Sequence, residues 1–252
     1  MPQFTESAPG AQAILDRGPS AAWWLTGVRG ANVYLVRLPS GSYVLVDAGL
    51  PGSDGAIVER LRALGVTSVE AILLTHSHPD HAGAAARLRE ALGARVVLGA
   101  GDVRDGRVRG DRRIPANACA VDLALPAEEC EPLPGVLAIP FPGHTAGSTV
   151  YAFPSLDLWC IGDIALHSGD RMSRPIPPSN DDTPAQERAL QALAARVGLN
   201  GAPGHGDPVI GTFDVLVRAL ASRPPASGPW WLRILLNPRV VLRFARRQAG
   251  RH

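Results

Sequence analysis

The chain has 252 residues, of which 46% are apolar and 19% are charged, and its formal net charge is +2. This composition excludes disordered, fibrous and coiled-coil proteins, the small net charge argues against an evenly basic nucleic-acid binder, and no apolar run reaches the ~18 residues of a transmembrane helix. The charge is unevenly distributed, because the segment from Arg223 to the C-terminus holds seven arginines and no acid.

Strands that alternate with helices are predicted for the first half of the chain. The β-rich runs 32–38 and 43–46 flank the turn Pro39-Ser40-Gly41 and predict a hairpin. Apolar residues at helical spacing then predict a helix that is capped by Ser53 and ended by Gly65. The elements expected next are a buried strand over 71–74, a helix over 82–92 and a strand over 95–98.

The stretch 99–134 is expected to be irregular, because its arginines, acids and prolines follow no period. A connection of this length is either a functional lid or a solvated insertion. In the first case its arginines meet a substrate carboxylate, and in the second its aspartates balance them in solvent. The arginines are Arg107, Arg109, Arg112 and Arg113, and the aspartates are Asp102, Asp105 and Asp111.

The second half begins with strands expected over 136–139, 148–153 and 156–161. Thr183-Pro184-Ala185-Gln186 is a capping box, which predicts a helix that runs to about Val197 and is closed by Gly198. A short helix over 212–221 and a linker over 222–229 follow. The predicted organisation is one domain, residues 1–222, and a linker with an apolar-basic tail, residues 223–252.

Aspartate and histidine recur at predicted strand ends in both halves of the chain. Asp47 and His76 end strands in the first half, and Asp163 and His205 do so in the second. This repetition predicts two sheets that meet edge to edge, with a polar site where their strand ends converge.

The strongest motif is His76-Ser77-His78-Pro79-Asp80-His81, which directly follows a buried strand. A turn at this place lets residues i and i+2 point the same way, while residues i+4 and i+5 begin the next helix. His144 and His205 each follow a Pro-Gly pair, so that five of the seven histidines lie in three strand-end turns. Imidazole and carboxylate ligands suit zinc, with iron or manganese as alternatives.

These residues resemble the metallo-β-lactamase superfamily. The H-x-H-x-D-H signature lies at residues 76–81, the later histidines are His144 and His205, the aspartate is Asp163, and the strand before the motif ends at Asp47. The resemblance covers about residues 30 to 210. It implies an α/β (α+β) fold that is arranged as a four-layer αβ/βα sandwich.

The resemblance also implies two metal ions in one site. The two ligand sets that it assigns are His76, His78 and His144 for one ion, and Asp80, His81 and His205 for the other. Asp163 would bridge the ions, and Asp47 would orient one of the ligands. Two cations about 3.5–4 Å apart would share a water that loses a proton near neutral pH. The resulting bridging hydroxide would attack a carbonyl, while Asp80 acts as the catalytic proton shuttle.

The complete ligand set resembles that of glyoxalase II and the acyl-homoserine lactonases. His78 replaces the glutamate of the diiron flavoprotein branch, and Asp163 replaces the cysteine of common β-lactamases. We therefore predict a dinuclear zinc hydrolase of a small ester, thioester or lactone. The alternatives are a persulfide dioxygenase with one iron ion and, with less support, a phosphodiesterase.

Four further expectations concern His167, the tail, the localisation and the partner. His167 either touches substrate at the mouth of the site or is an exposed loop residue. The tail from Trp230 to His252 packs on the body, contacts an anionic membrane surface peripherally, or forms a homodimer contact. No signal peptide is visible, which favours the cytoplasm, with membrane association if the tail binds lipid. The expected partner is a small-molecule substrate and not nucleic acid.

Overall fold

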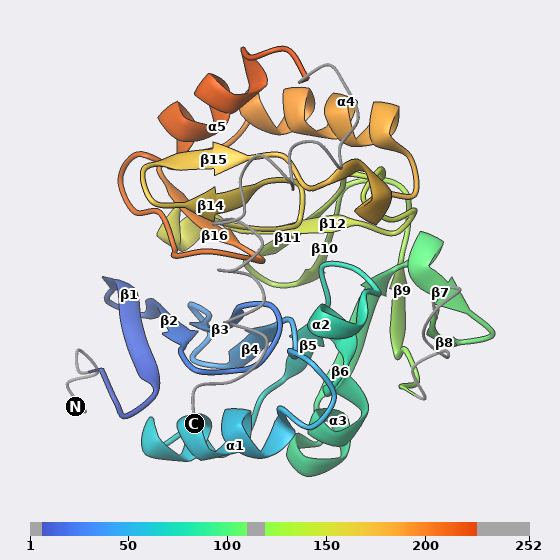
Figure 1. Ribbon diagram of the computed structural model, residues 1–252. Coiled ribbons are helices and arrows are strands. Elements are labelled where there is room, and N and C mark those ends of the chain that lie inside the picture. The colour runs from blue at the N-terminus through green and yellow to red at the C-terminus, as the bar shows by residue number, and fades with distance from the viewer. Residues whose placement is uncertain (1–6, 110–118, 226–252) are drawn as a thin grey trace.

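The computed structural model describes residues 7–109 and 119–225, in which two sheets lie face to face with helices on both outer faces (Figure 1). This arrangement confirms the predicted four-layer sandwich. The prediction that the sheets meet edge to edge is wrong, because residues of both sheets pack into one apolar layer between them. The predicted tail, Trp230 to His252, and the arginines at 112 and 113 lie outside the described residues.

The first sheet has the strand order β1-β2-β3-β4-β5-β6-β9. Neighbours from β1 to β4 pair antiparallel, and those from β4 to β9 pair parallel. Its strands are β1 (Ala11–Arg17), β2 (Ser20–Leu25), β3 (Val33–Arg37), β4 (Tyr43–Val46), β5 (Ala71–Leu73), β6 (Arg95–Gly99) and β9 (Leu123–Leu125). The predicted hairpin is β3–β4, whereas β1 and β2 were not predicted.

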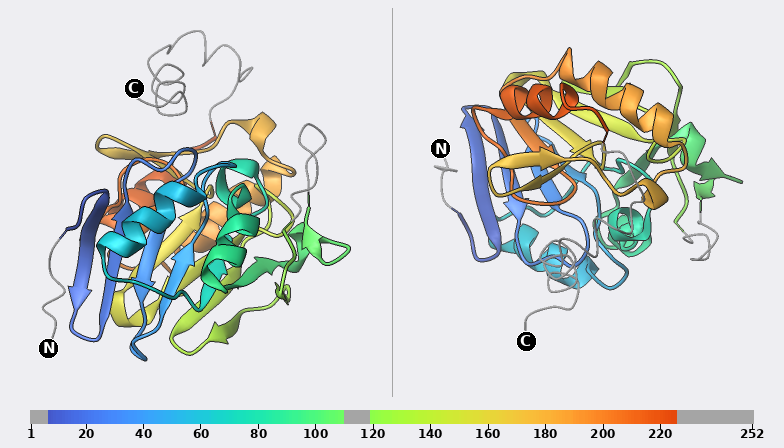
Figure 2. Two further views of the ribbon diagram at one scale, coloured as in Figure 1. Left: turned by 90° about the horizontal axis from the view of Figure 1, so that it is seen from below. Right: turned by 45° about the horizontal axis from the view of Figure 1, so that its top comes forward.

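Helices α1 (Asp54–Ala63), α2 (Pro79–Ala82) and α3 (Ala85–Leu92) follow strands of this sheet, and α1 and α3 cover its outer face (Figure 2). Ser53 precedes α1 but does not cap it, since its hydroxyl donates to the Arg29 carbonyl instead. The helix predicted over 82–92 is interrupted at Gly83. A Cβ at Gly83 would overlap Pro51, so this position requires glycine where the two loops touch.

The stretch 99–134 is more regular than predicted. It contains the short helix η1 (Ala100–Asp102), the hairpin strands β7 (Val103–Arg104) and β8 (Arg107–Val108), then β9 and β10 (Cys130–Leu133). β9 extends the first sheet and β10 begins the second, so the stretch joins the two halves of the sandwich. The expectation of a solvated insertion is wrong for Asp102, whose side chain is completely buried.

The second sheet has the order β10-β11-β12-β13-β16, in which only β13 and β16 pair parallel. Its other strands are β11 (Val136–Pro140), β12 (Thr149–Phe153), β13 (Leu158–Gly162) and β16 (Asn200–Pro203), with η2 (Pro154–Leu156) between β12 and β13. A separate hairpin, β14 (Leu166–Ser168) with β15 (Arg171–Ser173), and the short helix η3 (Pro177–Ser179) follow β13.

Helices α4 (Thr183–Ala194) and α5 (Phe213–Ala221) cover the outer face of the second sheet (Figure 2). The cap of α4 is Asp182 and not the predicted Thr183, because the Asp182 carboxylate accepts the Ala185 N–H at 2.8 Å. Among the described residues, none of the helices combines the length and the apolar character needed to cross a bilayer.

The apolar layer between the sheets sets much of the stability of the sandwich. Phe153 on β12 is 1% exposed and packs in this layer with Tyr34 and Val44 of the first sheet. We expect Phe153→Ala to lower the free energy of unfolding by about 3–5 kcal/mol, because it removes buried surface and leaves a cavity. Urea unfolding measures the change. Val215→Ala on α5, at a side chain that is 59% exposed, should cost less than about 0.5 kcal/mol; equal losses would contradict this core assignment.

Candidate metal centre

The predicted ligands lie where strands of one direction end. β4, β5 and β6 are parallel, so Asp47 and the 76–81 turn emerge at the same edge of the first sheet. β11, β13 and β16 share one direction in the second sheet, so the turns that carry His144, Asp163 and His205 emerge together as well. The facing of the two sheets brings the seven predicted side chains to one place.

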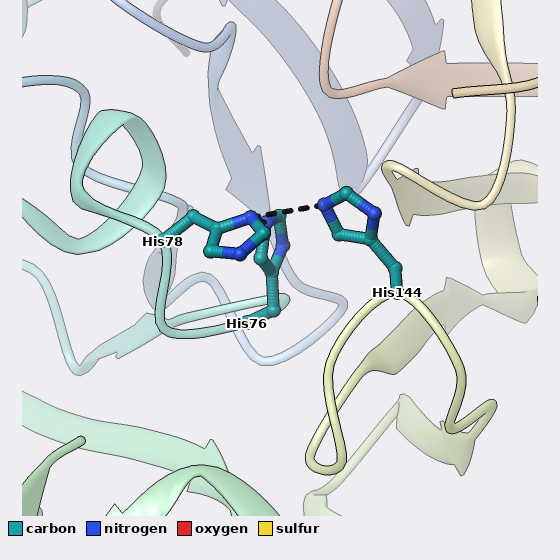
Figure 3. Close-up of side chains that lie close together, drawn as sticks. All are labelled: His76, His78 and His144. Atoms are coloured by element: carbon teal, nitrogen blue, oxygen red, sulfur yellow. Dashed lines mark hydrogen bonds between the residues drawn. The ribbon is translucent and has the colours of Figure 1, made fainter. Parts of the chain in front are cut away.

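Three of these histidines form a tight cluster (Figure 3). The Nδ1 atom of His78 lies 3.0 Å from Nε2 of His76 and 3.0 Å from Nε2 of His144. His76 and His144 are buried and His78 is half-buried. Ligand nitrogens around tetrahedral zinc lie about 3.3 Å apart, given a Zn–N distance of about 2.05 Å. The three ring nitrogens therefore have the spacing of a three-histidine metal site.

A second, acidic cluster adjoins the first. His205 Nε2 lies 3.2 Å from Asp80 Oδ2 and 3.4 Å from Asp163 Oδ2. The other carboxylate oxygen of Asp163 lies 3.4 Å from Nε2 of His81. Oδ2 of Asp163 is also 3.6 Å from Nε2 of His144, which belongs to the first cluster. Asp163 therefore faces histidines of both clusters, as a bridging ligand must.

The chemistry of the donors fits metal ions. Nε2 of His81 and Oδ1 of Asp163 are buried, and apart from their 3.4 Å contact with each other neither has a hydrogen-bond partner, although buried polar atoms are nearly always paired. A cation between them would satisfy both atoms. The combination of imidazoles and carboxylates suits zinc or iron rather than calcium or magnesium, which prefer oxygen ligands.

Asp47 and Thr75 fix the orientation of two of the histidines. One oxygen of the buried Asp47 carboxylate lies 2.8 Å from Nδ1 of His81, and the other accepts the Thr75 N–H at 2.8 Å. The Thr75 hydroxyl lies 3.1 Å from Nδ1 of His76. When the proton is held on Nδ1 of each ring, Nε2 is unprotonated and its lone pair is available to a metal ion in the centre. The sequence predicted this role for Asp47 but not for Thr75.

Asn180 plays the same part for His144 and was not predicted. Its side-chain oxygen lies 2.9 Å from Nδ1 of His144, and the backbone N–H of Asp181 donates to the His144 carbonyl at 2.9 Å. Asn180 follows η3, 36 residues from His144 in the sequence. No local pattern marks it, because its position depends on how this segment packs against the His144 turn.

The two clusters differ in charge. Burial lowers the pKa of His76 well below its ordinary value, and the adjacent histidines add to this effect. In the acidic cluster, burial alone would lower the pKa of His205, but Asp163 and Asp80 raise it to about 9. Burial would raise the pKa of Asp80, yet His81 and His205 hold it at about 2. A cation that binds the acidic cluster must displace a proton from His205, so its affinity should fall as the pH drops below about 9.

Other residues singled out in the sequence lie around the centre. Nδ1 of His167, on β14, lies 2.8 Å from the carbonyl of Asp207, and its backbone N–H donates to the His205 carbonyl at 3.0 Å. His167 thus braces the turn that carries His205, and its contact with substrate stays a prediction. Arg109 pairs with Asp181 at 3.6 Å and is partly exposed; a role of Arg107 or Arg109 toward a substrate carboxylate also stays a prediction.

Replacement of Asp47 tests how much the orientation of His81 by this carboxylate contributes to metal affinity. In Asp47→Asn, the amide group must either lose the Thr75 N–H or face Nδ1 of His81 with a donor, which favours the wrong tautomer of the ring. We expect metal affinity to fall about 10–100-fold, as measured by competition with a chromophoric chelator. Asp214→Asn removes a carboxylate that pairs with Arg218 on α5 and should leave the affinity unchanged. Equal affinities for the two variants would contradict the role given to Asp47.

Comparison with known proteins identifies the family that this fold and this centre define. The model of the metallo-beta-lactamase superfamily matches residues 26–216, and the chain belongs to that superfamily. This result confirms the resemblance on which the predicted fold and ligand set depend.

Several curated relatives are named as hydrolases. The hydroxyacylglutathione hydrolase of Acidiphilium cryptum (strain JF-5) is 35% identical over 159 residues, which are 62% of this chain and 56% of that protein. The probable metallo-hydrolase YflN of Bacillus subtilis (strain 168) is 48% identical over 64 residues, or 24% of each chain. The chain spans about half the length of the hydroxyacylglutathione hydrolases that it matches.

Solved structures share the fold. TTHA1623 in a di-iron-bound form is 28% identical with a TM-score of 0.58, and the match covers 73% of this chain and 92% of that one. The metallo-beta-lactamase SMB-1 bound to 2-mercaptoethanesulfonate is 22% identical with a TM-score of 0.59, over 79% of this chain and 81% of that one. At this lower identity the likeness to SMB-1 concerns the fold alone.

Proposed function

We propose that the protein is a dinuclear metal-dependent hydrolase, with zinc as the metal, that cleaves a small ester, thioester or lactone. The observation that carries this proposal is the position of Asp163, whose two oxygens face histidines of both clusters. A mononuclear site would need only one of these clusters, whereas here each cluster has three converging donors.

Cations held by these two clusters would supply a water-derived nucleophile at neutral pH and would polarise the substrate oxygen that becomes anionic. The chain itself provides the ligands and the proton acceptor. The Asp80 side chain is 24% exposed, so part of it is accessible to solvent, while Oδ2 remains 3.2 Å from Nε2 of His205. Its low pKa keeps it ionised. An ionised carboxylate in this place can orient the attacking water, accept its proton and pass the proton to the leaving group.

The names of the relatives support a hydrolase and leave the metal open. Hydroxyacylglutathione hydrolases and a probable metallo-hydrolase are among the curated matches, whereas the structure of TTHA1623 is described in a di-iron-bound form. The substrate class proposed here is therefore broader than the name of any one relative.

A substrate panel tests the reaction class. Protein loaded with zinc is assayed against an acyl thioester, a homoserine lactone, a nitrophenyl ester and a nitrophenyl phosphodiester. We expect turnover of at least one carbonyl substrate, lost on treatment with a chelator and restored by zinc. Turnover of the phosphodiester alone would favour the phosphodiesterase alternative. Oxygen uptake with a persulfide, by protein that holds one iron ion, would replace the proposal by the dioxygenase alternative.

A further inference from the structure

A buried carboxylate outside the predicted ligand set joins the two turns of the three-histidine cluster. Asp102, at the end of η1, is 0% exposed. Its Oδ2 atom accepts the backbone N–H of Ser77 at 2.8 Å and the hydroxyl of Thr145 at 2.7 Å. Its Oδ1 atom accepts the backbone N–H of Gly147 at 2.9 Å. Ser77 lies between His76 and His78, and Thr145 follows His144, so one side chain binds both ligand turns.

The backbones around Asp102 are in direct contact. A Cβ at Gly99 would overlap the carbonyl of Gly147, and a Cβ at Gly101 would overlap the carbonyl of Ala146. Only glycine permits this approach of η1 to the 145–148 turn. The separation of the two turns is thus set by close backbone packing and by the three hydrogen bonds to one carboxylate.

We propose that Asp102 is a positioning residue, which holds the His76–His78 turn and the His144 turn at the separation that the first metal ion requires. The inference rests on the proposed dinuclear centre and adds the residue that preforms one half of it. Asp102 contacts neither the substrate nor the reacting atoms in this assignment.

The hydrogen-bond geometry determines which variant is informative. Both oxygens of Asp102 accept an N–H of the backbone, from Ser77 on one side and from Gly147 on the other. Asp102→Asn therefore places an amide donor against one of these N–H groups in either orientation, although the side chain keeps its size. We expect one of the two turns to shift and the three-histidine cluster to lose affinity for metal.

Two single-site backgrounds separate the halves of the centre. His205→Ala disrupts the acidic cluster and leaves the three-histidine cluster intact. His78→Ala disrupts the three-histidine cluster and leaves the acidic cluster intact. The apoprotein of each background is titrated with Co²⁺ against a chromophoric chelator, and the visible spectrum of the bound cobalt is recorded. Asp102→Asn should weaken cobalt binding about 10–100-fold in the His205→Ala background and less than about twofold in the His78→Ala background.

Matched variants distinguish positioning from general loss of stability. Thr145→Val removes one hydrogen bond to Asp102 and should weaken cobalt binding in the His205→Ala background. Thr145→Ser keeps the hydroxyl and should bind cobalt as the His205→Ala protein does. Asp122→Asn changes another carboxylate that binds a backbone N–H, that of Val96 at 2.8 Å, and should leave the affinity unchanged.

The role of Asp102 would be overturned if Asp102→Asn weakened cobalt binding equally in both backgrounds, or if Asp122→Asn weakened it as much. Either result would leave the proposed dinuclear centre intact. If neither the His205→Ala protein nor the His78→Ala protein binds cobalt, the proposed dinuclear centre is wrong, and the role of Asp102 is wrong with it. If Asp102→Asn does not fold, the Thr145 pair decides, because valine and serine differ there in the hydroxyl that reaches Asp102.

Discussion

Asp163→Ala should reduce the bound metal to one equivalent or less and lower kcat by about a thousandfold or more. The carboxylate faces His81, His144 and His205, so its removal would deprive the two proposed ions of a shared ligand. It would also leave the positive charge of these ions with one fewer buried anion. Elemental analysis of the purified variant and steady-state rates on the best substrate of the panel measure the two effects.

Asp170→Ala is the control for this change. Asp170 lies in the exposed turn of the β14–β15 hairpin, seven residues after Asp163, and the same atoms are removed there. The control should keep both metal equivalents and nearly all activity. Full metal content in Asp163→Ala would show that the residue is not a bridging ligand.

Asp80→Asn should have the second largest effect on kcat, but without the loss of metal expected for Asp163→Ala. The amide oxygen can still face His205 and the metal, so we expect most of the metal to be retained. The variant has no anionic proton acceptor, and kcat should fall about 10²–10⁴-fold while KM changes little. Parallel measurements of kcat, KM and metal content separate this outcome from loss of the site.

The matched control for Asp80→Asn is Asp54→Asn in the first turn of α1, where the carboxylate lies 4.0 Å from the guanidinium of Arg87. It should leave kcat and KM unchanged. If kcat of Asp80→Asn equals that of the parent protein, Asp80 has no part in proton transfer, whatever it contributes to metal binding.

The ligands could be predicted because each follows a strand, where a short motif fixes its direction. The turn from His76 to His81 alone supplies four donors within six residues. Asn180 could not be found in this way, since its contact with His144 depends on how η3 folds back on a turn 36 residues earlier in the sequence.

Asp102 also has a signal in the sequence. It follows β6 within Gly-Ala-Gly-Asp, as Asp47 and Asp163 follow β4 and β13. The arginines and acids beyond it have the composition of a solvated loop, which masks the position of Asp102 near a strand end. A strand-end aspartate preceded by glycine therefore deserves the same weight in an irregular stretch as in a regular one.

The fold was predictable where apolar runs were bounded by turns, as in β3–β4 and β11–β13. The hairpin β14–β15 escaped prediction, because strands of three residues each show no period. The face-to-face packing of the two sheets could not be predicted either. Buried strands of both sheets are apolar on both faces, so the pattern does not show whether a partner lies beside them or above them.

The metal content of the native protein tests the central claim most directly. Protein purified without chelators is analysed for zinc, iron and manganese by mass spectrometry, with its concentration determined by amino-acid analysis. The proposed centre predicts close to two equivalents of zinc per chain, and hydrolysis that is lost and regained with them. One equivalent of iron, or less than one equivalent of any transition metal in active protein, would contradict it.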